Sequence, residues 1–267
     1  MMKKTKFNVL LPFLILLLGM YPNNIAGQDL SEYKKDMVVH KGDTLPYRIL
    51  LPLYYNPNVK YPLVLFLHGS GERGNDNNLQ LTHGADLFLQ ESVRQEYPAV
   101  IVFPQLAKDH HWTYLVSDRE SSPGELIYPA KKTKIKHQEL LKVLIKKLKK
   151  QLSLDSDRFY VGGLSLGGMG TFEIVNQNPK MFAAAFPICG GANPKIAQRI
   201  NKPSWWIFHG VDDVVVPAKF SQRMYDALKQ AGADVKLSMY PGVNHDSWTN
   251  AFAEPDLLEW MFSKSLK

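Results

Sequence analysis

The chain has 267 residues and a formal net charge of +7, with 45% hydrophobic and 21% charged residues. This length suits one large α/β domain or two small ones, and the hydrophobic content excludes an intrinsically disordered protein. Three of the surplus positive charges are Lys3, Lys4 and Lys6, so the chain without its first 27 residues carries +4 (7 − 3). So small a surplus, together with the lack of a nucleic-acid-binding motif, argues against a nucleic-acid partner.

Residues 1–27 are predicted to form a cleaved signal peptide. The three lysines begin it, an apolar run over 9–18 interrupted only by Pro12 follows, and the small residues 26–27 offer a cleavage site. The apolar run is too short to span a bilayer, and no cysteine stands directly after the leader, so neither a membrane anchor nor lipid attachment is expected. We predict a secreted or periplasmic protein whose mature chain, 28–267, is one catalytic domain.

The first elements predict a sheet that begins antiparallel and becomes parallel. Residues 28–35 are polar, and we expect a loose N-terminus there. Residues 37–40 and 47–51 flank a Gly-Asp turn and predict two antiparallel strands. Residues 63–67 are continuously apolar, as in a strand that is buried on both faces of a parallel sheet.

A glycine-rich loop, His68-Gly69-Ser70-Gly71-Glu72-Arg73-Gly74, follows this strand. Glycines let the backbone approach a ligand closely, so we expect the loop to present the Ser70 N–H to a developing oxyanion. The alternative is an ordinary turn between a strand and a helix.

A helix over 79–90 and a buried strand over 99–103 come next. The stretch 105–134 has no clean periodicity, and we interpret it as an insertion loop over the ligand-bearing edge of the sheet. Trp112 and Tyr114 in this loop are candidate substrate-binding residues, because aromatic faces suit sugar rings and hydroxycinnamoyl groups. For Trp112 the alternative is an aromatic residue that anchors the loop.

Metal binding is not expected. His110 and His111 are adjacent in a polar loop, without a carboxylate or a further histidine at the spacing that metal ligands require. Cys189 is the only cysteine, so it cannot form an internal disulfide, and its apolar neighbours predict a buried, inert thiol.

Residues 135–152 predict an amphipathic helix with leucines on one face and lysines on the other. The next strand ends in Gly163-Leu164-Ser165-Leu166-Gly167, which matches the G-x-S-x-G pattern of a nucleophile elbow. A serine on such a strained turn is held above the sheet edge, and the helix behind it offers backbone N–H groups. We predict Ser165 as the nucleophile and the Leu166 N–H as the second oxyanion donor; the alternative is a turn that only packs a helix on a strand.

Strands and helices alternate to the end of the chain. Helices are expected over 168–177, 219–232 and 255–264, and strands over 182–189, 205–208 and 235–240. This alternation predicts a largely parallel sheet wrapped by helices, with ligands bound outside the carboxyl ends of its strands.

Two loops at that edge supply a base and an acid. His245 follows the last strand and is the best candidate for the base, since an imidazole can take a proton from a serine and return it. Asp212 and Asp213 follow the preceding strand, and we prefer Asp213. His68 and His209, each at a strand end before a glycine, are expected to be structural.

The chain resembles an α/β-hydrolase over almost its whole mature length. The resemblance rests on the glycine-rich loop, the serine elbow, His209-Gly210-Val211-Asp212-Asp213-Val214-Val215-Val216-Pro217 and Asn244-His245-Asp246-Ser247-Trp248. The pattern H-G-x-x-D-x-x-V-P places the family's acid on Asp213. The resemblance implies a mostly parallel sheet of about eight strands with helices on both faces, and a serine esterase that needs no metal or cofactor.

Within this superfamily the chain is similar to secreted bacterial esterases of the phospholipase/carboxylesterase and polyhydroxybutyrate-depolymerase-like groups. These groups include feruloyl and acetyl-xylan esterases, so we expect a small-molecule or oligosaccharide ester as substrate, with Trp248 beside Trp112 and Tyr114 in its binding site. A serine aminopeptidase or oligopeptidase on the same triad, and a non-catalytic binding module that kept the fold, are the alternatives. The loop 105–134 matches no substrate-defining pattern.

Overall fold

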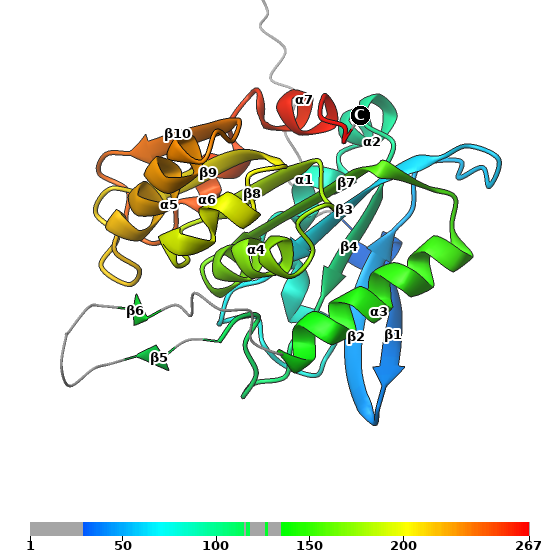
Figure 1. The fold of residues 1–267 in the computed structure, drawn as a ribbon. Helices are drawn as coiled ribbons and strands as arrows, with labels where there is room; N and C mark the ends of the chain where they lie inside the picture. The colour runs from blue at the N-terminus through cyan, green and yellow to red at the C-terminus, as the bar shows by residue number, and fades with distance from the viewer. Residues whose placement is uncertain (1–28, 115, 118–125, 128–134, 267) are drawn as a thin grey trace, which may run out of the picture.

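The structure, a computed structural model, describes residues 29–114, 116–117, 126–127 and 135–266 (Figure 1). The predicted signal peptide and most of the predicted insertion loop therefore lie outside the described residues. Within the described part of the chain, no helix combines the length and the apolar character needed to cross a membrane.

An eight-stranded sheet forms the centre of the structure, in the order β1-β2-β4-β3-β7-β8-β9-β10. Its strands are β1 (Lys34–His40), β2 (Asp43–Leu50), β3 (Tyr61–Leu67), β4 (Val100–Pro104), β7 (Leu154–Leu164), β8 (Ala184–Ile188), β9 (Ser204–Gly210) and β10 (Val235–Tyr240). Neighbouring strands are parallel from β4 to β10, whereas β1 pairs antiparallel with β2 and β2 antiparallel with β4. The predicted fold class is confirmed.

Helices cover both faces of this sheet (Figure 1). The α-helices are α1 (Ala85–Leu89), α2 (Glu91–Glu96), α3 (Lys136–Gln151), α4 (Leu166–Gln177), α5 (Lys219–Gln230), α6 (Trp248–Phe252) and α7 (Leu257–Phe262), and the short 3-10 helices are η1 (Leu30–Glu32), η2 (Leu79–Leu81) and η3 (Pro194–Arg199). Leu63, Leu65 and Leu67 of β3 belong to an apolar core shared with α3, α4 and α5. The alternate residues Val64 and Phe66 belong to a second core, shared with α1, α6 and α7. A strand with a core on each face must be apolar throughout, which explains the continuous apolar run at 63–67.

Three sequence-based expectations are wrong. The N-terminal segment is not loose, because Tyr33 is fully buried and its hydroxyl donates a hydrogen bond to the carbonyl of Ala85 at 2.9 Å. The helix expected over 79–90 is divided into η2 and α1, since Gly84 takes a left-handed φ of +82°. The ring of Phe252 lies 2.5 Å from where a Cβ of Gly84 would stand, so α6 packs onto this break. The helix expected over 255–264 is shorter, as α7, and α6 precedes it.

The predicted insertion loop contributes one element that the sequence did not indicate. Strands β5 (Val116–Ser117) and β6 (Leu126–Ile127) pair antiparallel in a two-stranded sheet of their own.

The contact between α4 and β3 gives a test of the fold. A Cβ added at Gly167 would lie 1.8 Å from the carbonyl oxygen of Leu67, which is backbone and cannot move aside. We expect Gly167→Ala to cost about 3 kcal/mol of stability, which lowers the Tm of a domain of this size by roughly 6–12 °C. Gly71→Ala is the matched control, because nothing lies within 4 Å of its added Cβ. Equal melting temperatures of the two variants, measured by calorimetry, would contradict this account of the elbow.

Candidate active site

Ser165 occupies a strained turn between β7 and α4. Its φ of 52° and ψ of −116° lie in a region that residues with a Cβ rarely adopt. Its N–H donates to the carbonyl of Ile188 at 2.9 Å, which ties the turn to β8. A Cβ at Gly163 would lie 2.4 Å from the carbonyl oxygen of Gly167, so the two glycines of the motif let the strand and the helix meet this closely.

The three predicted triad residues lie together at the carboxyl ends of β7, β9 and β10. The Oγ of Ser165 is 2.9 Å from Nε2 of His245, and Nδ1 of His245 is 2.7 Å from Oδ2 of Asp213. A carboxylate only accepts hydrogen bonds, so the proton of the neutral ring resides on Nδ1 and Nε2 is left as an acceptor. The arrangement orients an imidazole to take the proton of the serine hydroxyl.

The carboxylate of Asp213 is completely buried. Its Oδ1 accepts the N–H groups of Val215 and Val216, both at 2.8 Å, and its Oδ2 accepts from His245 and also from Nε2 of His209 at 3.1 Å. Burial by itself raises the pKa of Asp213, but the hydrogen bonds from the two histidines and the two amides outweigh it and hold this pKa far below its usual range. The acid therefore stays ionised.

His68 and His209, which were both predicted to have structural roles only, have different surroundings. His68 fits that expectation: its Nε2 accepts from the N–H of Leu106 at 3.0 Å and its Nδ1 lies 2.6 Å from the carbonyl oxygen of Gly69, while burial lowers its pKa to about 4. His209 instead contacts the carboxylate of Asp213, the proposed acid. The sequence did not predict this contact. The signal available was its position four residues before Asp213.

The two predicted oxyanion donors belong to the first turn of α4 and to the loop after β3. Leu166 is the first residue of α4, so its N–H has no partner within the helix. Ser70 is exposed in the loop after β3, and the guanidinium of Arg73 donates to its carbonyl at 2.9 Å, which fixes the orientation of that part of the loop. A Cβ at Gly69 would lie 2.7 Å from the side chain of Leu164, so the loop packs directly on the elbow.

Of the three predicted substrate-binding residues, Trp112 does not have the role expected of it. It is fully buried, and its Nε1–H donates to the carbonyl of His68 at 3.0 Å. It therefore anchors its loop, which was the alternative for this residue, because a side chain in the core cannot contact a substrate. Tyr114 is 53% exposed, and Trp248 is partly exposed with its ring edge-on to His245 at 5.7 Å.

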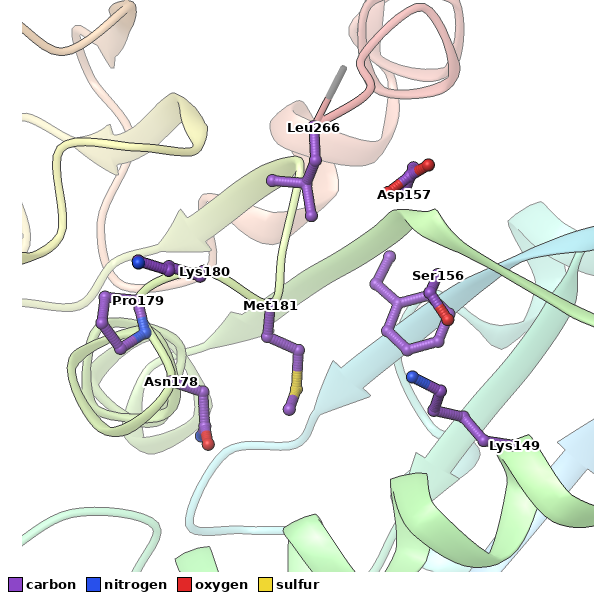
Figure 2. A pocket seen from close by; sticks show the side chains of 9 residues that line it. Lys149, Ser156, Asp157, Asn178, Pro179, Lys180, Met181 and Leu266 are labelled. Atoms are coloured by element: carbon purple, nitrogen blue, oxygen red, sulfur yellow. The ribbon is translucent and has the colours of Figure 1, made fainter.

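A hollow of about 550 Å³ lies at the opposite edge of the sheet (Figure 2). Its walls come from the end of α3 at Lys149, the start of β7 at Ser156 and the end of α4 at Asn178. Strands begin at this edge, whereas Ser165 follows the carboxyl end of β7. The hollow is therefore separate from the candidate active site.

Comparison with known proteins identifies the family. The sequence profile described as Phospholipase/Carboxylesterase matches residues 57–255, which is most of the chain and includes every predicted triad residue. The chain belongs to the phospholipase/carboxylesterase family. This membership confirms the expected α/β-hydrolase superfamily.

Individual relatives match over varying lengths. Acyl-protein thioesterase 1 of Neurospora crassa is 31% identical over 102 residues, 35% of this chain and 42% of the thioesterase. The bifunctional acetylxylan esterase/xylanase of Neocallimastix patriciarum is 26% identical over 190 residues, 70% of this chain and 23% of that protein. The chain thus spans less than half the length of these curated relatives.

Solved structures show the same fold. A thermostable esterase is 33% identical, with a TM-score of 0.79 over 88% of this chain and 64% of that chain. A ferulic acid esterase from Anaeromyces mucronatus is 17% identical, with a TM-score of 0.62 over 85% of this chain and 89% of that chain, which is a likeness of fold alone.

Cys189 lies against the candidate active site. Its Sγ, a carboxylate oxygen of Asp213 and a ring nitrogen of His245 all lie within 4.8 Å of one another, the one group of three potential metal ligands found among the described residues. The imidazole and the carboxylate of this group are hydrogen-bonded to each other, and burial raises the pKa of the Cys189 thiol well above its usual range. The thiol is therefore neutral in the native protein.

A thiol that is buried and neutral should not react. We expect the native protein to resist a chromogenic disulfide reagent at pH 8 and to release one equivalent of chromophore only in guanidinium chloride, because the thiolate is the nucleophile. The matched control is Cys189→Ala, which should release none in either condition. Rapid stoichiometric labelling of the native chain would show that the side chain is accessible.

Proposed function

We propose that the protein is a secreted serine esterase that removes acyl groups, acetyl or feruloyl, from plant polysaccharides or their oligosaccharides. The observation that carries the reaction is the unbroken chain from Ser165 Oγ to His245 Nε2 at 2.9 Å and from His245 Nδ1 to Asp213 Oδ2 at 2.7 Å. Secretion rests on the signal-peptide pattern of residues 1–27.

In the proposed reaction, Oγ of Ser165 attacks the acyl carbon while Nε2 of His245 takes the hydroxyl proton. The tetrahedral oxyanion that forms is held by the backbone N–H groups of Leu166 and Ser70. Asp213 stabilises the imidazolium, which then returns its proton to the oxygen of the departing alcohol. Water then attacks the acyl-serine while Nε2 of His245 takes one of its protons. The imidazolium returns this proton to Oγ of Ser165, which releases the acid and restores the serine.

The alcohol side of the site supports a carbohydrate substrate. Because His245 protonates the leaving oxygen, the alcohol departs on the side of this imidazole, where Trp248 packs edge-on at 5.7 Å. The ring of His83 packs against Trp248 at 4.9 Å, and a carboxylate oxygen of Glu72 lies 3.5 Å from Nε2 of His83. A partly exposed indole braced in this way offers a flat face to a sugar ring.

The acyl groups proposed are those named for two relatives. The Neocallimastix protein is described as an acetylxylan esterase/xylanase, and the Anaeromyces structure as a ferulic acid esterase. The exposed Tyr114 adds an aromatic side chain in the loop before β5.

The reaction is tested with Ser165→Ala. We expect wild type to hydrolyse aryl esters, to release acetate or ferulate from acylated arabinoxylan and to be labelled by a fluorophosphonate, and the variant to lose about 10⁴-fold or more in kcat with no labelling. A panel of acetyl, butyryl, long-chain and cinnamoyl esters then ranks the acyl groups. Faster cleavage of peptide anilides than of aryl esters would instead identify a peptidase, and equal inactivity of wild type and variant would leave a binding module.

The carbohydrate proposal is tested with Trp248→Ala and the milder Trp248→Phe. We compare kcat/KM for a feruloylated xylo-oligosaccharide with kcat/KM for methyl ferulate, so that any effect on His245 cancels in the ratio. Loss of the stacking face should lower this ratio about 3- to 10-fold in the alanine variant, with phenylalanine in between. An unchanged ratio would remove Trp248 from the alcohol subsite.

A further inference from the structure

We propose that His209 is a positioning residue for the reaction: its Nε2–H holds the carboxylate of Asp213 against His245 and shares the negative charge of that carboxylate. The inference rests on the proposed roles of Asp213 and His245, and it adds a fourth side chain to the triad. His209 is the penultimate residue of β9, and its side chain is completely buried.

The surroundings of His209 decide where its proton lies. Nε2 is 3.1 Å from Oδ2 of Asp213 and 2.8 Å from the carbonyl oxygen of Val216. An ionised carboxylate and a carbonyl can only accept, so Nε2 carries a proton whether the ring is neutral or cationic. Nδ1 lies 2.6 Å from Oγ of Ser221, which is 2.9 Å from the carbonyl oxygen of Gly190. The ring is thus fixed between α5, the end of β8 and the acid loop.

This contact completes the hydrogen bonding of a carboxylate that water does not reach. The amides of Val215 and Val216 donate to Oδ1 alone, so Oδ2 is left to be satisfied by side chains. The N–H of His209 restrains the second oxygen, Oδ2, on the side of His245. Both histidines use the same oxygen, so the position of one ring is linked to the position of the other.

The same contact moderates the charge that His245 experiences. Three other groups in the described part of the chain face the pair formed by Asp213 and His245: the thiol of Cys189, the hydroxyl of Ser165 and the exposed carboxylate of Asp246. The thiol is neutral, because burial raises its pKa. A donor on Oδ2 withdraws negative charge from it and weakens its attraction for a proton on His245. Removing the donor should therefore strengthen the interaction between Oδ2 and the positive charge that forms on His245 during the reaction.

The experiment compares His209→Leu, which removes the N–H, with His209→Gln, whose amide N–H reaches about the position of Nε2. His68→Leu is the matched control, because His68 is also a buried histidine before a glycine but hydrogen-bonds to Leu106 and Gly69 and not to Asp213. For each protein we measure kcat and KM for one aryl ester from pH 4 to pH 9, together with Tm.

We expect His209→Leu to lower kcat at least about tenfold with little change in KM, and to move the acid limb of the kcat/KM profile to higher pH. His209→Gln should recover most of kcat and the wild-type limb, and His68→Leu should leave the limb in place. A His209→Leu variant with wild-type kcat and acid limb would overturn the inference, as would a glutamine variant no better than leucine. Failure of the proposed function is distinct, since wild type would then be inactive or no better than Ser165→Ala.

A measurement on the unaltered ring covers the case in which the leucine variant does not fold. In wild-type protein labelled with ¹⁵N-histidine, NMR should show a protonated Nε2 on His209, and Asp213→Asn should shift this resonance together with that of Nδ1–H of His245. An unprotonated Nε2 on His209, or a resonance that does not respond to Asp213→Asn, would overturn the inference.

Discussion

The close approach of α4 to the end of β3 is the constraint on which the site depends. At Gly167 the helix runs so near the carbonyl of Leu67 that no Cβ fits between them. This contact brings the first turn of α4 next to the residues that end β3 and begin the loop after it. The strained φ of Ser165 follows from it, because the chain must reverse within one residue to begin the helix there.

A second constraint is electrostatic. Burying the carboxylate of Asp213 is costly unless its lone pairs are satisfied, and four N–H groups satisfy them. Two of these come from the backbone of the acid's own loop, so the local turn solvates the charge before any partner is added. The remaining two come from the imidazoles of His209 in β9 and His245 after β10. The carboxylate therefore links these two neighbouring strands at the site.

The sequence predicted the parts of this arrangement that rest on local patterns. The apolar run at 63–67, the G-x-S-x-G turn and the loops holding Asp213 and His245 each have a signature within a few residues, and the order of strands and helices places them at one sheet edge. Two errors arose where tertiary packing overrides a local pattern. Gly84 divides a helical pattern because Phe252 packs onto it, and the polar segment near Tyr33 is fixed by a bond to Ala85.

Trp112 and His209 show the same limit at the site. An aromatic residue in a polar loop has the same local sequence whether it lines a pocket or anchors the loop, and only its hydrogen bond to His68 distinguishes the two. For His209 the pattern H-G-x-x-D placed a histidine near the acid, but whether its ring turns toward the carboxylate depends on Ser221 in α5 and on Gly190 after β8. Side-chain direction at a strand end is set by neighbours remote in sequence, so residues that act through another residue are harder to predict than the reacting groups themselves. The reacting groups lie on short turns and loops with their own sequence signatures, whereas a supporting group is defined only by the fold.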